Sequence, residues 1–209
     1  MVLPAPPAAA QAFELRCFQP PGAAAAALPS PSPSPSPLSL SPPLSPPPSL
    51  RLQGSVGRSG ERLSLAYRLS DPDGLVLLPP PAPRPRRADG LWSTTCLEFF
   101  LAEPGAPPYW EFNLAPSGDW NAYRLAAYRQ GLEPVAAIAS LPLQVERDAS
   151  GLDLRLSLDL GHLLPPGRAL ELGITAVLEL NDGPLLYWAL SHPGAEADFH
   201  RRDGFLVRI

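Results

Sequence analysis

Apolar and polar residues alternate along much of the chain, in segments that have the length of β-strands. Residues 152–160 (LDLRLSLDL) alternate without a break, so their five leucines lie on one face of a strand. Asn181, Asp182 and Gly183 tolerate left-handed backbone conformations and predict a tight hairpin turn. Alternation or a dense apolar run predicts further strands at residues 13–17, 63–70, 94–103, 169–180, 185–192 and 204–209.

The pattern predicts an all-β fold. It contains roughly nine to eleven short strands with turn signals between them and no confident long amphipathic helix. An antiparallel β-sandwich, jelly-roll-like in form, is the natural architecture for such a chain. Residues 119–130 stay open, because Trp120, Tyr123 and Tyr128 fit helical spacing as well as a twisted strand.

Two proline-rich segments interrupt the strands. Residues 19–50 form a Pro/Ser tract that favours solvated polyproline conformations and has too little apolar area to repay ordering, so we predict disorder. Residues 78–90 contain Arg84, Arg86 and Arg87 among prolines and predict a mobile, solvated Pro/Arg loop. Strand-like sequence flanks both segments, so residues 1–209 are interpreted as one domain with two loop insertions. Recruitment of partner proteins by the proline tract is an alternative role.

Composition and charge exclude several classes of function. A net charge near −4 argues against nucleic-acid binding, which usually requires a basic face. No apolar run reaches the roughly 18 residues of a membrane span, and the N-terminus lacks the pattern of a secretory signal. Cys17 and Cys96 are too few for a disulfide framework and predict reduced, buried thiols. We therefore expect a cytoplasmic protein with no nucleic-acid or membrane partner; the pattern leaves its oligomeric state open.

Motifs for catalysis and metal binding are absent from the sequence. It contains no nucleophile elbow, phosphate-binding loop or dinucleotide fingerprint, and no Cys or His pair at metal-ligand spacing. The three histidines are His162, His192 and His200, and none stands in a recognisable catalytic arrangement. We predict that the protein is not an enzyme, with no catalytic residues and no metal site.

Residues 109–129 carry six of the chain's sixteen aromatic residues, interspersed with acids, amides and arginines. Strand alternation places Trp110 and Phe112 on one face, which we predict to be core. The opposite face, a possible ligand platform, carries Tyr109, Glu111 and Asn113. Sugars suit a surface of rings and placed polar groups; the alternative is that the rings simply fill the sandwich.

Residues 187–205 (YWALSHPGAEADFHRRDGF) form a second dense group of aromatic and polar residues. His192 precedes a proline, which favours an extended or turning backbone there. One interpretation is a contribution to a binding site. The other is a polar loop whose Asp–Arg pairs hold the last strand in place.

Three blocks in order, LWSTTCLEFFLAE, YWEFNLAPSGDWNAYRLAAYR and YWALSHPGAEADFHRRDGF, resemble DOMON-like proteins related to family 9 carbohydrate-binding modules. The resemblance covers roughly residues 91–209, and it implies an antiparallel β-sandwich that binds a ligand without catalysis. In the sugar-binding relatives, paired tryptophans clamp a terminal sugar while charged and amide side chains bind its hydroxyls. The resemblance therefore implies a sugar or another small molecule as partner.

The candidate ligand-binding residues follow from the aromatic clusters and this resemblance together. They are Trp92, Glu98, Tyr109, Glu111, Asn113, Trp120, Arg124, Trp188, His192 and His200. Haem-binding DOMON domains use a methionine and a histidine as axial ligands. The only methionine here is Met1, so no cofactor is predicted. A haem or redox module held by His192 and His200 is the alternative.

Overall fold

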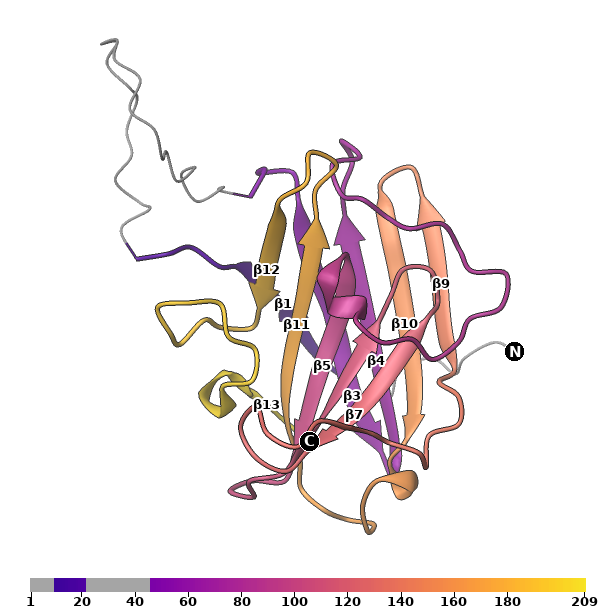
Figure 1. The fold of residues 1–209 in the computed structure, drawn as a ribbon, viewed down its shortest axis with the longest axis vertical. Coiled ribbons are helices and arrows are strands. Elements are labelled where there is room, and N and C mark those ends of the chain that lie inside the picture. The colour runs from indigo at the N-terminus through magenta and orange to yellow at the C-terminus, as the bar shows by residue number, and fades with distance from the viewer. Residues whose placement is uncertain (1–9, 22–45) are drawn as a thin grey trace.

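The computed structural model describes residues 10–21 and 46–209 and shows an all-β fold of two antiparallel sheets packed as a sandwich (Figure 1). The five-stranded sheet has the order β1 (Gln11–Glu14), β3 (Arg51–Ser59), β4 (Arg62–Ser70), β10 (Gly151–Asp159) and β9 (Leu143–Asp148). The larger sheet has eight strands. Seven of them have the order β2 (Arg16–Cys17), β12 (Leu185–Ala189), β11 (Glu171–Glu179), β5 (Cys96–Ala102), β6 (Tyr109–Leu114), β7 (Trp120–Leu125) and β8 (Glu133–Pro134). The eighth, β13 (Val207–Arg208), pairs with β11 outside this order. Within the described residues the short 3-10 helices are η2 (Leu91–Ser93), η3 (Leu160–His162) and η4 (Arg202–Gly204). The predicted antiparallel β-sandwich is confirmed.

Several strands lie where alternation placed them, whereas β3 and β9 were not predicted. The predicted segments 63–70, 94–103, 152–160 and 169–180 correspond to β4, β5, β10 and β11. The predicted turn connects β11 to β12, with the Leu180 amide donating to the Pro184 carbonyl at 2.9 Å. Residues 120–125 form strand β7 rather than a helix, which resolves the ambiguity in that segment.

The main core lies between the two sheets. Leu65, Leu154 and their strand neighbours on the smaller sheet face the larger sheet, where Phe99 and Phe112 stack with ring centroids 4.4 Å apart. Trp110 belongs to the same core. The prediction that Trp110 and Phe112 form the core face of residues 109–113 is therefore confirmed.

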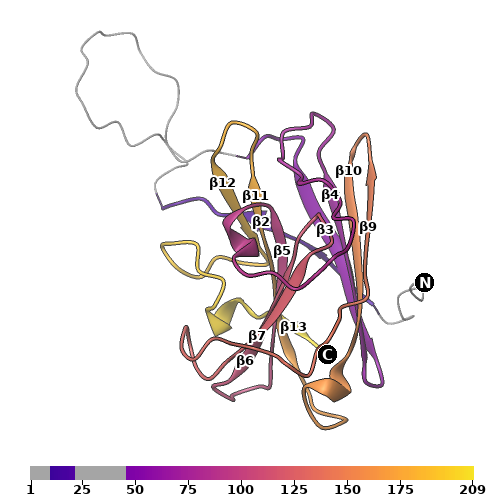
Figure 2. The same cartoon turned by 45° about the vertical axis from the view of Figure 1, so that its right-hand side comes forward.

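A second layer covers the far face of the larger sheet. Figure 2 shows the yellow C-terminal segment on the side of this sheet that faces away from the smaller sheet. Phe205 of that segment packs so closely on Gly173 of β11 that a Cβ there would lie 2.7 Å from its ring. Phe205 joins a small apolar cluster with Phe100, Tyr109 and Tyr123. The larger sheet is thus buried on both faces, which is why β5 and β6 read as dense apolar runs.

Glu171 of β11 fastens the covering segment. Its carboxylate accepts hydrogen bonds from Arg202 and Arg208, and its side chain is 9% exposed. Arg202 also donates to the carbonyls of Ala106 at 2.7 Å and Glu103 at 3.0 Å. These contacts fix the end of the chain across the sheet.

The Pro/Arg loop of residues 78–90 makes contacts with the sheet that its composition did not predict. We expected a mobile, solvated loop, but Arg87 is half-buried and its guanidinium lies 4.5 Å above the Trp120 ring. The same guanidinium donates to Asn121 Oδ1 (2.7 Å) and to the carbonyls of Ala122 (3.2 Å), Val135 (3.0 Å) and Ile138 (2.5 Å). The backbone also pairs with β7, because the Trp120 amide donates to the Arg86 carbonyl at 3.0 Å. The loop is therefore attached to the sheet at several points.

Some predictions lie outside the described residues. The Pro/Ser tract of residues 19–50 falls mostly on residues 22–45, so its disorder and its recruitment of partners stay predictions, as does the single domain spanning residues 1–209. In the part of the chain that the structure describes, no helix is long and apolar enough to cross a membrane.

A candidate ligand cavity on the outer face of the larger sheet

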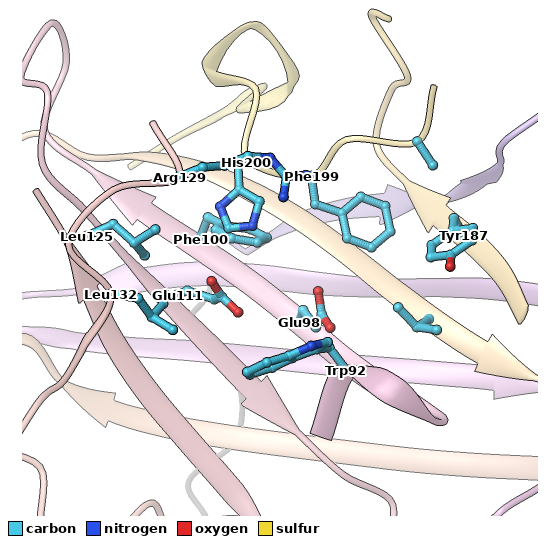
Figure 3. A pocket seen from close by; sticks show the side chains of 12 residues that line it. Trp92, Glu98, Phe100, Glu111, Leu125, Arg129, Leu132, Tyr187, Phe199 and His200 are labelled. Atoms are coloured by element: carbon cyan, nitrogen blue, oxygen red, sulfur yellow. The ribbon is translucent and has the colours of Figure 1, made fainter. Parts of the chain in front are cut away.

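A cavity of about 380 Å³ lies between the outer face of the larger sheet and the segments that cover it (Figure 3). Strands β5 and β6 contribute its floor, and helix η2, the turn after β7, strand β12 and the C-terminal segment contribute its walls. It is lined by Trp92, Glu98, Phe100, Glu111, Leu125, Arg129, Leu132, Val177, Tyr187, Ala197, Phe199 and His200.

Two buried carboxylates form the polar part of the floor. Phe100 pairs with Glu111 across β5 and β6, so Glu98, two residues before Phe100, points to the same face as Glu111. Glu98 is 3% exposed and Glu111 6%. Glu98 Oε1 has no hydrogen-bond partner among the described residues, and Oε2 lies at 3.5 Å from Thr175 Oγ1. Glu111 is better satisfied, because Asn113 Nδ2 donates to it at 2.9 Å.

Burial makes ionisation of this pair unfavourable. Burial, and then the negative charge of Glu111, raise the pKa of Glu98 to about 8. Burial also raises the pKa of Glu111, opposed by the Asn113 hydrogen bond and the charge of Arg129. In the described part of the chain, neither carboxylate forms an ion pair. At neutral pH Glu98 therefore keeps its proton, and its carboxyl group can both donate and accept a hydrogen bond.

His200 and Tyr109 form a hydrogen-bonded wall. The Arg129 amide donates to the Tyr109 hydroxyl oxygen at 3.1 Å, and His200 Nδ1 lies 2.8 Å from that oxygen. The Tyr109 hydroxyl and His200 Nδ1 are therefore joined by a hydrogen bond whose direction depends on the tautomer of the imidazole. Burial, with the nearby Arg129 charge, lowers the pKa of His200 to about 4, so the imidazole is neutral at physiological pH.

Arg129 connects the turn after β7 to the C-terminal segment. Its backbone is left-handed, with φ 54°, and its guanidinium donates to Asp198 Oδ1 at 2.8 Å. The Tyr128 hydroxyl also donates to Asp198, whose Oδ1 accepts from the His200 amide at 3.1 Å. The charge of Arg129 is thus balanced by Asp198 rather than by the carboxylates of the floor.

Aromatic rings with exposed area line the remaining sides. Trp92 is 40% exposed and Tyr187 37%, values that are high for residues of their size beside a cavity. The rings of Trp92 and Tyr123 pack in a T-shaped arrangement with their centroids 5.9 Å apart, and the ring centroids of Tyr187 and Phe199 lie 6.0 Å apart in the same arrangement. Figure 3 shows Trp92 on one side of the two carboxylates, with His200 and Phe199 on the other.

A cluster of hydrogen-bonded polar side chains fixes the position of Trp92. The Tyr123 hydroxyl donates to Asp89 at 2.6 Å, and Asn121 Nδ2 donates to the same carboxylate at 2.9 Å. Asp89 immediately precedes Gly90, whose left-handed backbone (φ 71°) begins helix η2. The hydrogen bonds of Asp89 therefore hold the turn that presents Trp92.

Four of the ten sequence-predicted residues line the cavity: Trp92, Glu98, Glu111 and His200. Tyr109 and Asn113 lie directly behind it, bonded to His200 and Glu111. Whether any of these residues binds a ligand stays a prediction.

The other four predicted residues lie elsewhere. Trp120 and Trp188 are each 5% exposed and belong to the core between the sheets, because they pair with Leu114 and Ala176 on the inner face. Arg124 pairs with Trp110, also on that side, and is exposed. His192 is outside the cavity lining, where Nε2 lies 2.8 Å from the Arg16 carbonyl oxygen. These four residues therefore do not line the cavity that holds Glu111, and whether any of them binds a ligand stays a prediction.

Sequence reasoning missed Tyr187, Phe199, Arg129 and the apolar lining residues. Alternation along β12 could have identified Tyr187 as an outer-face residue, because it pairs with Val177, which also lines the cavity.

The structure places only one of the two histidines of the haem alternative at the cavity, His200, and its Nδ1 is engaged by Tyr109. Within residues 10–21 and 46–209, no group of three or more His, Cys, Asp or Glu side chains could hold a metal ion.

Comparison with known proteins gives a likeness of fold. No protein-family model matches the chain, and neither does any curated protein. Among solved structures, one similar chain is described as "a putative carbohydrate-binding protein" from Bacteroides uniformis, with a TM-score of 0.57 and 13% identity, covering 75% of this chain and 76% of that one. A likeness at this identity concerns the fold alone.

A second solved structure is a family 9 carbohydrate-binding module from Caldicellulosiruptor kristjanssonii in complex with glucose. It has a TM-score of 0.43 and 11% identity, and covers 69% of each chain. A TM-score below 0.5 is too low to bear on the architecture, so the resemblance to DOMON-like proteins and this family stays a prediction.

Proposed function

We propose that the protein is a non-catalytic carbohydrate-binding domain whose ligand enters the cavity on the outer face of the larger sheet. The observation that carries the proposal is the pairing of exposed rings, Trp92 and Tyr187, with two buried carboxylates, Glu98 and Glu111. The cavity volume of about 380 Å³ lies within the range of small-molecule sites.

A sugar matches both halves of this surface. Its C–H faces pack on aromatic rings, while its hydroxyls exchange hydrogen bonds with carboxyl groups and with an imidazole such as that of His200. A buried oxygen without a partner, such as Glu98 Oε1, costs about 1–3 kcal/mol. A ligand hydroxyl that donates to it would remove that cost, and the gain would favour binding.

The fold supports the same interpretation. The Bacteroides uniformis chain of similar fold is described as a "putative" carbohydrate-binding protein. We infer from the position of the cavity that the ligand enters on the outer face of the larger sheet and not between the sheets. The proposal includes stacking of the ligand on the rings of Trp92 and Tyr187.

Trp92→Ala is expected to weaken sugar binding at least about tenfold, because it removes one exposed stacking face, a loss of roughly 1.4 kcal/mol or more. Isothermal titration of the full chain against a panel of neutral and amino monosaccharides and disaccharides measures this. Tyr187→Ala is expected to act in the same direction.

Two control variants separate binding from folding. Leu77→Ala removes an exposed apolar side chain outside the cavity lining, and Trp120→Phe changes a core ring outside that lining. Both are expected to leave affinity unchanged, with Trp120→Phe lowering only thermal stability. The proposal is wrong if the folded protein binds no sugar of the panel, or if Trp92→Ala binds as tightly as the parent.

A further inference from the structure

The carboxyl groups of the cavity floor form no ion pair within the described part of the chain. Glu98 and Glu111 point into the same space, and both are more than nine-tenths buried. The cation in the lining, Arg129, lowers the pKa of Glu111 by its charge, but its guanidinium bonds Asp198 at 2.8 Å. The floor is therefore a pair of carboxyl groups without a bonded cation, within apolar and aromatic walls.

A neutral sugar satisfies this floor only in part. Hydroxyl groups donate to the two carboxyls but bring no charge, so the burial and the negative charge of Glu111 that keep a proton on Glu98 persist. An ammonium group brings three donors and a positive charge. Buried carboxylates gain most from a partner of opposite charge, because the low local dielectric strengthens the interaction.

The aromatic walls favour the same group. The faces of tryptophan and tyrosine rings attract ammonium ions, at about 0.5–2 kcal/mol depending on desolvation. Trp92, Phe199 and Tyr187 surround the carboxylates in the cavity lining. Acidic groups enclosed by rings are suited to a cationic amine.

We propose that the cavity selects sugars that carry a free amino group, with the ammonium held between the carboxylates of Glu98 and Glu111. This inference rests on the proposed function and narrows its ligand to amino sugars.

Binding of the ammonium displaces a proton. Before binding, Glu98 is protonated below its pKa of about 8; with the ammonium in place both carboxyls are ionised, and the proton leaves to solvent. A neutral sugar leaves the proton on Glu98. The groups around the Glu98 side chain include Cys96, Glu111, Thr175, Arg129 and His200, and Tyr67 donates to its backbone carbonyl from the core side. Burial keeps Tyr67 and Cys96 protonated and His200 neutral throughout this range, so the released proton comes from the carboxyl pair of Glu98 and Glu111.

The test is calorimetric titration of the full chain with glucosamine, glucose and N-acetylglucosamine, just below neutral pH. Each titration is run in phosphate and in Tris, whose different ionisation enthalpies report protons released. We expect glucosamine to bind at least about tenfold more tightly than the two neutral sugars, with release of up to one proton. Glu98→Gln is expected to remove both the preference for glucosamine and the proton release. Glu133→Gln, which removes an exposed carboxylate on β8, is the matched control and keeps both.

The outcomes of these titrations distinguish failure of the amino-sugar inference from failure of the proposed function. If glucose binds as tightly as glucosamine, or glucosamine binds without proton release, the amino-sugar inference is wrong and carbohydrate binding stands. If none of the three sugars binds the folded chain and the wider sugar panel is also negative, the proposed function is wrong and the inference falls with it. A Glu98→Gln variant that keeps the preference for glucosamine also overturns the inference. Circular dichroism of each variant establishes that it is folded.

Discussion

Replacing Arg87 by alanine is expected to lower the free energy of unfolding by about 3 kcal/mol, because a half-buried guanidinium with several acceptors is lost. The substitution leaves the carbonyls of Val135 and Ile138 without their donor and removes the cation above the Trp120 ring. Hydrogen bonds from a charged donor contribute about 1.5–3 kcal/mol each, and losses that share one side chain do not add fully. Urea unfolding followed by tryptophan fluorescence measures the change.

Arg86→Ala and Arg87→Lys make this prediction specific. Arg86 is exposed, and its backbone bond to Asp119 survives truncation, so its loss is expected to cost less than about 0.5 kcal/mol. Lysine keeps the charge at position 87 but lacks the planar fork, so it is expected to recover only a minor part of the loss. Equal stability of Arg87→Ala and the parent would show that the loop of residues 78–90 is solvated, as its composition suggests.

Alternation predicted faces correctly where the strand was uninterrupted. Residues 109–113 divide into a core face and an outer face as the period of two requires, so Glu111 and Asn113 could be placed from sequence. The error at Trp120 and Trp188 has a different origin. Both were selected by residue type, and a shift of one residue along a strand moves a side chain to the opposite face. The outer-face residues beside them are Asn121 and Tyr187.

Long-range contacts explain what the sequence could not predict. Arg87 is ordered by acceptors that lie 34 to 51 residues further along the chain, which local composition does not reveal. Similarly, the C-terminal segment, about a hundred residues further along the chain, contributes Phe199 and His200 to the cavity that holds Glu98. Burial of a carboxylate by a distant segment determines its chemistry, and neither alternation nor motif spacing carries that information.

Glu98→Gln is expected to stabilise the protein at alkaline pH and to leave it nearly unchanged in acid. The folded state raises the pKa of Glu98 from 4.5 to about 8, because burial and the charge of Glu111 oppose ionisation. Between these two values the folded chain holds a proton that the unfolded chain has released, so stability falls as pH rises through this window. Glutamine is neutral at every pH and avoids this loss. The difference between variant and parent therefore grows from near zero below pH 4.5 to at most about 5 kcal/mol above pH 8.

The difference between two stability curves isolates Glu98 from its neighbours. His200, whose pKa is lowered, adds stability as pH rises through the range between about 4 and 6.5, but it does so in both proteins. Urea unfolding at several pH values from acid to alkaline gives both curves, with the exposed Glu133→Gln as the control for losing one carboxyl group. A constant difference across this range would show that Glu98 ionises freely in the folded state. The floor of the cavity would then be solvated, and the argument for a buried acidic pair that needs a cation would lose its physical basis.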